Sequence, residues 1–543
     1  MLRITGGRVY DPANRIAGEV RDVCVQDGRI VDDVPAHART IDARGMVVMP
    51  GGVDIHAHIA GPKVNAARKL LPDEHRADVV DRTAIARSGT GGTVPSTFTT
   101  GYRYALLGYT TVVEAATPPL AARQTLAELR DTPVIDALFL ILMGNNLALF
   151  ELIRSEPARV REAIAWWLQA TGGYGVKLVN PGGVEMWKRD NGNVTSLDDE
   201  GPGVTPRQVI ETIATAVHDL GLPHPVHVHC NNLGVPGNWR TTLDTLRTLD
   251  GRRAHLAHLQ FHAYGGRVGG RPRSRAPELA DYLNSHPELS ADVGQVMFGP
   301  ATTMTADAPV SAVLRDITHG RWVNADTEVE TGCGIVPFTY RERNYVHALQ
   351  WGIGLELFLL SRDPWRLVLS TDHPNGGSFL SYPRLIRLLM DRDFRNEQIG
   401  RVNQQAMRRT VLRDDLDREY TLEEIAIITR AGPARLLGLA DKGHLGVGAD
   451  ADITIYDDRE DREEMFSAPR YVIKDGVAVV EDGELRAARQ GRLLRVGADY
   501  DTSIEPALEA LFEDRYSVQF SSYPVREPWL LEPARTVAAR GGP

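Results

Sequence analysis

Residues 47–65 read VVMPGGVDIHAHIAGPKVN, and this stretch decides the fold. A short apolar run, residues 47–49, ends in Pro50-Gly51-Gly52, and a second strand-like piece, residues 53–59, then carries His56 and His58. Side chains two residues apart lie on the same face of a strand, so the two imidazoles can hold one divalent metal ion side by side. The alternative is a pair of ordinary polar residues at the end of a strand.

Size and composition indicate a globular protein with two or more folding units. The chain has 543 residues, of which 43% are hydrophobic and 24% charged, and a single core seldom grows beyond about 250–300 residues. Its net charge of -10 offers no basic footprint for nucleic acid. Its three cysteines are too far apart for CxxC-type sites. The longest apolar run, residues 134–150, is interrupted and too short for a bilayer. We expect a cytoplasmic protein with no membrane partner.

The two ends of the chain predict one small β domain. Residues 1–52 read as short strands and turns, including an Asp27-Gly28 turn, and residues 446–457 and 471–480 repeat that pattern around Asp475-Gly476. Two half-sheets far apart in sequence are most simply explained if they pack together. We therefore assign residues 1–52 and 440–496 to a β-sandwich, 53–439 to an inserted domain and 497–543 to a C-terminal extension.

The inserted domain alternates strands and helices, which predicts a (β/α)8 TIM barrel with loop insertions. A doubly wound sheet is the alternative, but no GxGxxG follows the first strand. The Gly-rich segment 89–96 is predicted to be a mobile active-site loop. The predicted helices cover residues 120–130, 150–168, 205–220, 239–249 and 343–360. The predicted strands cover residues 53–59, 110–114, 135–143, 175–179, 225–229, 253–258, 293–298 and 367–371.

Polar side chains follow the ends of these strands, where such a barrel places its functional groups. Taken singly, each has an ordinary explanation, because a strand lysine can extend to solvent and a histidine often caps a loop. Their joint occurrence in this order favours a metal site. The candidates are His56, His58, Lys177, His227, His229, His255, His258, His262, Asp372 and His373.

The chemistry of this set is that of a two-metal hydrolase. A lysine buried in an apolar strand tends to lose its proton. The neutral amine of Lys177 can then take up carbon dioxide as a carbamate, whose two oxygens can bridge two ions. Asp372 would reach the water that the ions activate. Imidazole and oxygen ligands indicate zinc, one or two ions. The predicted ligands, besides Lys177 and Asp372, are His56 and His58 for one ion and His229 and His258 for the other.

Longer sequence motifs indicate which family the chain resembles. The order of ligands resembles the hydantoinase and dihydroorotase branch of the amidohydrolases. The phrases HIAGPKVN, VHVHCNNLGVPGN, HLQFHAYGG and STDHPNGGSFLSYP resemble the A subunit of formylmethanofuran dehydrogenase and that of the formyltransferase/hydrolase complex. This resemblance covers essentially the whole chain. It implies an amidohydrolase-type barrel, and it assigns metal or catalytic roles to His56, His58, Lys177 (as the carboxylated form), His229 and Asp372.

The sixth-strand ligand is open among three histidines, His255, His258 and His262. We select His258 because it occupies the strand-end position of the hydantoinase pattern, which leaves His262 either to support the metal ligands or to contact the substrate. His227 shares a strand face with His229, and only one of them need touch metal. The candidates for holding substrate are Lys63, His227, Asn231, Asn232 and His262.

The resemblance implies a reaction in one-carbon metabolism and methylotrophy. The family hydrolyses, or reversibly forms, the N-formyl amide of methanofuran or its bacterial analogue, with formate and a free amine as the products. The implied partners are subunits B, C and D and a coenzyme with a polyglutamate tail. Three alternatives remain: a hydantoinase or dihydropyrimidinase acting alone on cyclic amides, an archaeal protein of this type that runs toward synthesis, and a non-catalytic scaffold. The full ligand set argues against the scaffold.

Overall fold

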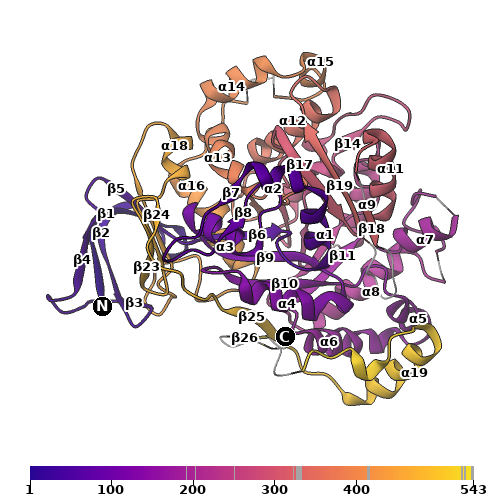
Figure 1. The fold of residues 1–543 in the computed structure, drawn as a ribbon. Helices are drawn as coiled ribbons and strands as arrows, with labels where there is room; N and C mark the ends of the chain where they lie inside the picture. Colours follow the sequence, from indigo (N-terminus) through magenta and orange to yellow (C-terminus); the bar gives the residue numbers. More distant parts are fainter. Residues whose placement is uncertain are drawn as a thin grey trace.

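The centre of the molecule is a closed barrel of eight parallel strands (Figure 1). The computed structural model describes residues 1–190, 192–201, 203–249, 251–321, 323–325, 333–412, 416–526, 530 and 534–539. The ring closes beyond the last strand, where Ala57 pairs with His373 and the amide of His58 donates to the carbonyl of His373 at 2.7 Å. The predicted TIM barrel is confirmed. Around the ring the strands are β6 (Gly52–Ala57), β9 (Tyr109–Thr117), β10 (Asp136–Leu142), β11 (Gly175–Val179), β12 (Val226–His229), β13 (Ala254–Leu256), β16 (Leu289–Asp292) and β20 (Leu367–Val368).

Helices cover the outside of this ring, which explains why the strands are apolar on both faces. The predicted helix 205–220 is α8 (Pro206–Asp219), which begins with a capping box between Thr205 and Gln208. The predicted helix 150–168 is two helices, α5 (Leu147–Ser155) and α6 (Val160–Thr171), because Pro157 opens a separate turn between them. The other barrel helices include α3 (Thr97–Leu106), α4 (Ala122–Asp131), α9 (Trp239–Thr248), α10 (Ala276–Ser285) and α12 (Tyr345–Leu360).

The seventh barrel strand is not the segment that the sequence predicted. Residues 293–298 are the more apolar, but the strand is β16, and residues 293–298 follow it without regular structure. Leu289 pairs with Ala254 of β13, and Ala291 pairs with Leu367 of β20. A four-residue strand that ends in aspartate has too weak a hydrophobic pattern to stand out. The corrected position brings Asp292 to the site described below.

Strands from both chain ends form a second, nine-stranded sheet. The two halves join where β5 (Met46–Pro50) pairs antiparallel with β21 (Ile453–Asp457). β1 (Leu2–Asp11) pairs with β4 (Arg39–Asp42) along its first half and with β5 along its second, and both parts contribute to one apolar core. The four residues of the two predicted Asp-Gly turns all have positive φ, as hairpin turns require. The other strands are β2 (Ile16–Gln26), β3 (Arg29–Val31), β22 (Tyr471–Lys474), β23 (Val477–Glu481) and β24 (Glu484–Leu485).

The end of the chain returns to the barrel. β25 (Leu493–Gly497) lies parallel to β10, and β26 (Ala534–Ala538) lies parallel to β25. The helix α19 (Glu505–Arg515) contacts α5, and the ring of Phe520 stacks on Trp166 of α6 with centroids 4.7 Å apart. In its described part, the C-terminal extension therefore wraps the outside of the barrel.

An inserted sheet and helix stand over the carboxyl ends of the barrel strands. The strands β17 (Gly299–Thr305), β19 (Cys333–Tyr340) and β18 (Val323–Ala325) form the sheet, and α11 (Ala308–Thr318) packs on it. The amide of Met304 donates to Oδ1 of Asn375 at 2.6 Å, which ties the sheet to the loop after β20. Segment 89–96 is held by a hydrogen bond between Thr93 and Thr302 and lies outside the cavity, so its prediction as an active-site loop is wrong.

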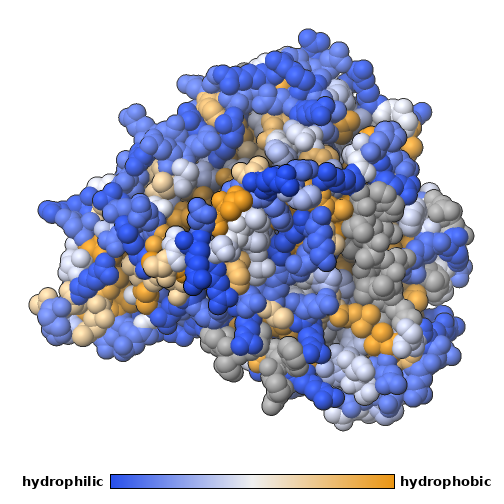
Figure 2. Space-filling model, viewed as in Figure 1, coloured by the Kyte–Doolittle hydropathy of each residue, from blue (hydrophilic) through white to orange (hydrophobic). Residues whose placement is uncertain are grey.

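Polar side chains predominate on the face of the molecule in Figure 2, and apolar ones form separate patches. Among the described helices, none combines the length and the apolar character needed to cross a bilayer. The large apolar side chains of the barrel helices are instead buried against the barrel strands.

Candidate metal centre

His56, His58 and Asp372 meet where the first and last strands of the barrel close the ring. His56 lies in β6, His58 just after it, and Asp372 beyond β20. Nε2 of His56 and Nε2 of His58 lie 3.2 and 3.1 Å from the same oxygen, Oδ1 of Asp372. Burial opposes ionisation, but the neighbouring imidazoles hold the pKa of Asp372 well below its usual range. An ionised oxygen and two imidazole nitrogens therefore face one another, as ligands of one cation would.

His229, His258 and His262 form a second group beside the first. Nδ1 of His229 lies 3.1 Å from Nε2 of His258, and the ring centroids of His258 and His56 are 5.3 Å apart. All three side chains are buried, yet Nδ1 of His258 and both ring nitrogens of His262 have no partner among the described residues. Buried nitrogens are rarely left unsatisfied. Three imidazoles whose ring nitrogens lie within 4.8 Å of one another fit a borderline cation such as zinc.

Lys177 lies in β11, next to His227 of β12 in the sheet register. Its side chain is 1% exposed and lines the cavity, and its Nζ has no hydrogen-bond partner among the described residues. Burial lowers the pKa of Lys177 to about 7, although Asp292 and Asp372 partly oppose this effect. The lowered pKa favours the neutral amine, which is the form that reacts with carbon dioxide.

Three buried carboxylates beside the histidines escaped the sequence analysis. Each lies near a ring nitrogen: Oε1 of Glu114 is 3.2 Å from Nδ1 of His58, Oδ2 of Asp292 is 2.9 Å from Nδ1 of His56, and Oδ2 of Asp307 is 3.1 Å from Nε2 of His229. A carboxylate beside the second nitrogen of a histidine fixes the ring and raises its basicity as a ligand. One signal was available, since Glu114 is a lone charge in the apolar run YTTVVEAAT.

Asp292 contacts several parts of the site at once. Its Oδ2 contacts His56, and its Oδ1 accepts from the backbone amide of His258 at 3.0 Å and from the hydroxyl of Ser370 at 2.5 Å. Nε2 of His255 lies 3.3 Å from the same Oδ2. Burial opposes its charge, but His56 and His255 hold the pKa of Asp292 well below its usual range. One carboxylate thus links the strand of His56, the loop of His258 and the segment that leads to Asp372.

The remaining predicted histidines lie behind or beside the cavity. Nε2 of His227 is 3.3 Å from Nδ1 of His56, and Nδ1 of His255 is 2.9 Å from the hydroxyl of Ser290. Neither lines the cavity, whereas His229 and His258 do. The ring of His373 packs against Phe379, and its carbonyl accepts the amide of His58. Of the three competing sixth-strand histidines, His258 lines the cavity, His262 lies beside it, and His255 lies behind Asp292.

The predicted substrate residues differ in their access to the cavity. Lys63 lines it, with Nζ 3.0 Å from Nδ1 of His58 and 3.1 Å from Oε1 of Glu114. Asn232 also lines it, but its amide nitrogen donates to the carbonyl of Val194. Asn231 lies outside, since its amide nitrogen donates to Asn180 at 2.8 Å. The structure therefore brings Lys63 and Asn232 to the cavity and leaves Asn231 and His227 away from it.

One cavity of about 460 Å³ is lined by His56, His58, Lys177, His229, His258 and Asp372. Its floor is polar, with His56, Lys177 and Asp372, and its upper wall is apolar, with side chains of α11 and β19. A polar floor under an apolar wall is typical of a small-molecule site. The unpartnered nitrogens on the floor fit metal ions, and the wall would exclude water from a bound ligand.

Known proteins share this architecture. Residues 39–480 match the model of the amidohydrolase family. The chain belongs to the amidohydrolase family. This amidohydrolase is 44% identical to the protein FwdA of Methanocaldococcus jannaschii, over 97% of each chain. It is 42% identical to the A subunit of the formyltransferase/hydrolase complex Fhc of Methylorubrum extorquens, over 97% of this chain and 96% of the relative.

Solved structures agree with this placement. The amidohydrolase superposes with a TM-score of 0.92, at 41% identity and 99% coverage of both chains, on a chain of the formyltransferase/hydrolase complex FhcABCD of Methylorubrum extorquens, determined with methylofuran. N-acyl-D-glutamate deacylase of Bordetella bronchiseptica shares the fold at a TM-score of 0.50 and 16% identity. The predicted resemblance to the family of FwdA and the Fhc A subunit is confirmed.

Proposed function

We propose that this amidohydrolase hydrolyses the N-formyl amide of a formylmethanofuran-type coenzyme to formate and a free amine. The supporting observation is the convergence of a low-pKa carboxylate, an unpartnered lysine and ligand-type histidines on one cavity. The chain's likeness to one protein of FhcABCD, at 41% identity, narrows the substrate from amides in general to the formyl amide of a methylofuran-type carrier.

The residues fit a zinc centre of one or two ions. His56, His58 and Asp372 would hold one ion, and His229 and His258 the other, with a carboxylated Lys177 between them. When bound, the ions would act as Lewis acids that polarise the formyl oxygen and lower the pKa of water. Glu114, Asp292 and Asp307 would hold the imidazoles of His58, His56 and His229 in the orientation for binding.

The chain's own residues would move the proton. Asp372 would accept a proton from the water that attacks the formyl carbon. It would pass that proton to the amine nitrogen as the carbon–nitrogen bond breaks, so water and formamide become formate and amine. No covalent bond between the enzyme and the substrate is needed. Lys63, held against His58 and Glu114, would place a positive charge beside the formyl group.

The chain would work as the A subunit beside subunits B, C and D. Its likeness to a chain of the FhcABCD complex over 99% of both chains supports this assembly. An archaeal-type role in synthesis would use the same residues, because a catalyst lowers the barrier in both directions. The equilibrium and the supply of formyl groups would then decide the direction.

A formate-release assay tests the proposal. The complex, or the chain as it purifies, is analysed for zinc and assayed with N-formylmethanofuran, with hydantoin and with dihydrouracil. We expect formate from the formyl amide alone, a loss of more than about 100-fold after chelation and recovery with zinc. Turnover of hydantoin without formate release would replace the proposal with the cyclic-amide alternative. A chain that purifies without metal and releases no formate would indicate a scaffold.

A further inference from the structure

The turn after the last barrel strand is bound by the inserted sheet that stands over the cavity. Residues 371–377, which read TDHPNGG, follow β20. The amide of Thr302 in β17 donates to the carbonyl of Pro374 at 3.1 Å. The hydroxyl of Tyr340 in β19 donates to the carbonyl of Asn375 at 3.0 Å. Two strands of the inserted sheet therefore hold the backbone of this turn.

The side chain of Asn375 joins the sheet to the carboxylate of Asp372. Its Oδ1 accepts from the amide of Met304 at 2.6 Å, and its Nδ2 donates to Oδ1 of Asp372 at 2.8 Å. A backbone amide can only donate, so the oxygen of the Asn375 amide must face Met304 and the nitrogen must face Asp372. The side chain is 7% exposed, and it lines the cavity.

The oxygen that Asn375 contacts is also the one that faces the two imidazoles of the first strand. Oδ1 of Asp372 lies 3.2 and 3.1 Å from Nε2 of His56 and Nε2 of His58. Within the described part of the chain, Oδ2 of the same carboxylate has no hydrogen-bond partner, and Asp372 lines the cavity. The two carboxylate oxygens therefore differ: one is held in place, and the other is left for the contents of the cavity.

The backbone of the turn is constrained as well. Asp372 has a φ of 50°, in the left-handed region that residues other than glycine seldom adopt without support from their surroundings. A Cβ atom at Gly376 would lie 2.7 to 2.9 Å from three carbonyl oxygens, those of Gly294, Gln295 and Thr371. This close packing supports the unusual conformation of Asp372.

The inserted sheet also forms the apolar wall of the cavity. The helix α11 packs on the sheet, and its Val310 and Leu314 line the cavity together with Phe338 of β19. Tyr340, whose hydroxyl holds the turn, lines it too. A ligand that packs against this wall therefore contacts the same sheet that fixes the amide of Asn375.

We infer that Asn375 is a positioning residue, which holds Oδ1 of Asp372 toward the metal histidines and leaves Oδ2 to take the proton from water. The inference rests on the proposed function, because it assigns Asn375 to the proton transfer of that reaction. An amide is neither an acid nor a base in neutral solution, so Asn375 acts through Asp372 and exchanges no proton itself. Holding a reacting group in place before the substrate arrives lowers the barrier of the chemical step.

Formate release from N-formylmethanofuran by the complete complex tests the inference. Asn375→Ala removes both hydrogen bonds of the amide. Asn375→Asp keeps the oxygen that accepts from Met304 and removes the donor to Asp372, so it tests the bridge even if the alanine variant does not fold. We expect each variant to lower kcat by about 10–100-fold with little change in KM. A wild-type kcat in Asn375→Asp would overturn the inference.

The control is Asn284→Ala, at an asparagine that makes the same kind of bridge away from the cavity. Nδ2 of Asn284 donates to the carbonyl of Leu360 at 3.0 Å, and its Oδ1 accepts from the amide of Arg362 at 2.9 Å. The control should leave kcat and KM unchanged. Failure of the proposed function is distinguishable, since the wild type and this control would then release no formate.

A double-mutant cycle with Asp372→Asn shows whether Asn375 acts through Asp372. In the Asp372→Asn background, Asn375→Ala should lower kcat by less than about twofold, because the group that it positions is already inactive. Independent losses that multiply would overturn the inference, as would a raised KM with an unchanged kcat, which would assign Asn375 to substrate binding.

A structural measurement needs neither substrate nor metal. In a crystal structure of the metal-free Asn375→Asp protein, the carboxylate of Asp372 should turn, so that its Oδ1 no longer lies within hydrogen-bond distance of both Nε2 of His56 and Nε2 of His58. An Asp372 side chain that keeps its wild-type position in this variant would show that Asn375 does not position it.

Discussion

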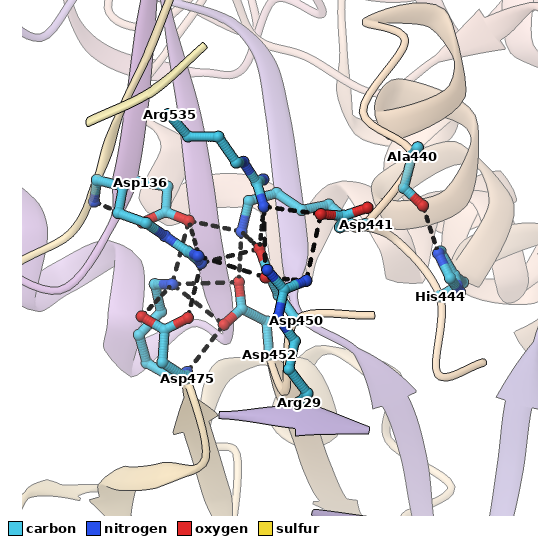
Figure 3. A network of polar contacts seen from close by, with 12 residues as sticks. Arg29, Asp136, Ala440, Asp441, His444, Asp450, Asp452, Asp475 and Arg535 are labelled. Carbon is cyan, nitrogen blue, oxygen red and sulfur yellow. Dashed lines mark hydrogen bonds and ion pairs between the residues drawn. The ribbon is translucent and has the colours of Figure 1, made fainter. Parts of the chain in front are cut away.

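Two buried clusters of ionisable side chains lie at opposite ends of the barrel, and they differ in how their polar atoms are satisfied. At the amino ends of the strands, Nζ of Lys442 lies 2.5, 3.0 and 2.8 Å from carboxylate oxygens of Asp136, Asp450 and Asp452 (Figure 3). Lys474 adds contacts to Asp136 and Asp452 at 3.1 Å. At the carboxyl ends, Nζ of Lys177, Nδ1 of His258 and both ring nitrogens of His262 lack partners in the described structure.

Proximity alone does not separate the two clusters. Both contain three ligand-type residues whose atoms lie within 4.8 Å of one another. The lower cluster contains its own cations, such as Arg492 at 2.8 Å from Asp450, and it also binds the C-terminal extension, since Arg535 reaches Asp450 at 3.1 Å. The upper cluster has one paired ammonium group, Lys63 at 3.1 Å from Glu114, but Nζ of Lys177 and three imidazole nitrogens have no partner among the described residues. A buried cluster that neutralises itself is structural, whereas one with unpartnered ligand atoms calls for an ion from outside.

The substitution Asp372→Asn has the largest expected effect, and it tests whether the upper cluster is catalytic. We expect formate release to fall by about 10²–10⁴-fold, because an amide cannot accept and return the proton. Zinc content should stay close to that of the wild type, since four histidines and Lys177 remain. Asp393→Asn, at an exposed acid, is the control and should change neither quantity. Undiminished formate release would remove Asp372 from the mechanism.

Lys442→Met breaks the lower cluster. It leaves three buried carboxylates short of a cation, so the free energy of unfolding should fall by about 3–5 kcal/mol in denaturant titrations. Activity per folded molecule should not change, because the metal centre is at the other end of the barrel.

Arg401→Ala is the matched control, because Arg401 pairs with Glu397 on the surface of α14 (Arg392–Arg401). Its cost should stay below about 0.5 kcal/mol. A Lys442 variant as stable as this control would show that the lower cluster contributes no stability.

Asp292→Asn tests the upper cluster at the residue that links its parts. Zinc affinity should fall by about 10–100-fold, because the carboxylate no longer orients His56. In the metal-free protein, ¹⁵N NMR of the histidines should show an altered tautomer balance for His56, a readout independent of catalysis. Ser290→Ala, on the same strand, should leave both unchanged. An unaltered zinc affinity in Asp292→Asn would reduce this residue to a packing role.

Acid titration gives the smallest expected effect. Burial opposes ionisation, but Lys442 and Lys474 lower the folded-state pKa of Asp136 and Asp452. A carboxylate with a depressed folded pKa contributes stability above its unfolded pKa of about 4 and loses it as the pH falls below that value. We expect a loss of about 1.4 kcal/mol per pH unit for each extra proton taken up. Asp452→Asn should flatten the profile below pH 4; an unchanged slope would exclude Asp452 from it.

The sequence predicted the barrel more completely than the site. His56 and His58 were detectable because two imidazoles stand two residues apart, and Lys177, His229 and Asp372 because each lies in or just beyond an apolar strand. Glu114, Asp292 and Asp307 lie 56, 236 and 78 residues from the histidines that they contact, and no local pattern marks such pairs. The weak pattern of β16 hid Asp292 as well. The roles of the predicted ligands remain predictions until metal is measured.

Closure of the ring determines when Asp372 joins His56 and His58. The imidazoles of His56 and His58 leave the ribosome long before Asp372, and the backbone bond from His58 to His373 forms only when the last strand reaches the first. During synthesis, the chain therefore contains His56 and His58 before it contains the carboxylate of Asp372. Zinc would bind only after the barrel has closed. A bound zinc ion would therefore indicate that the first and last strands of the ring are in place.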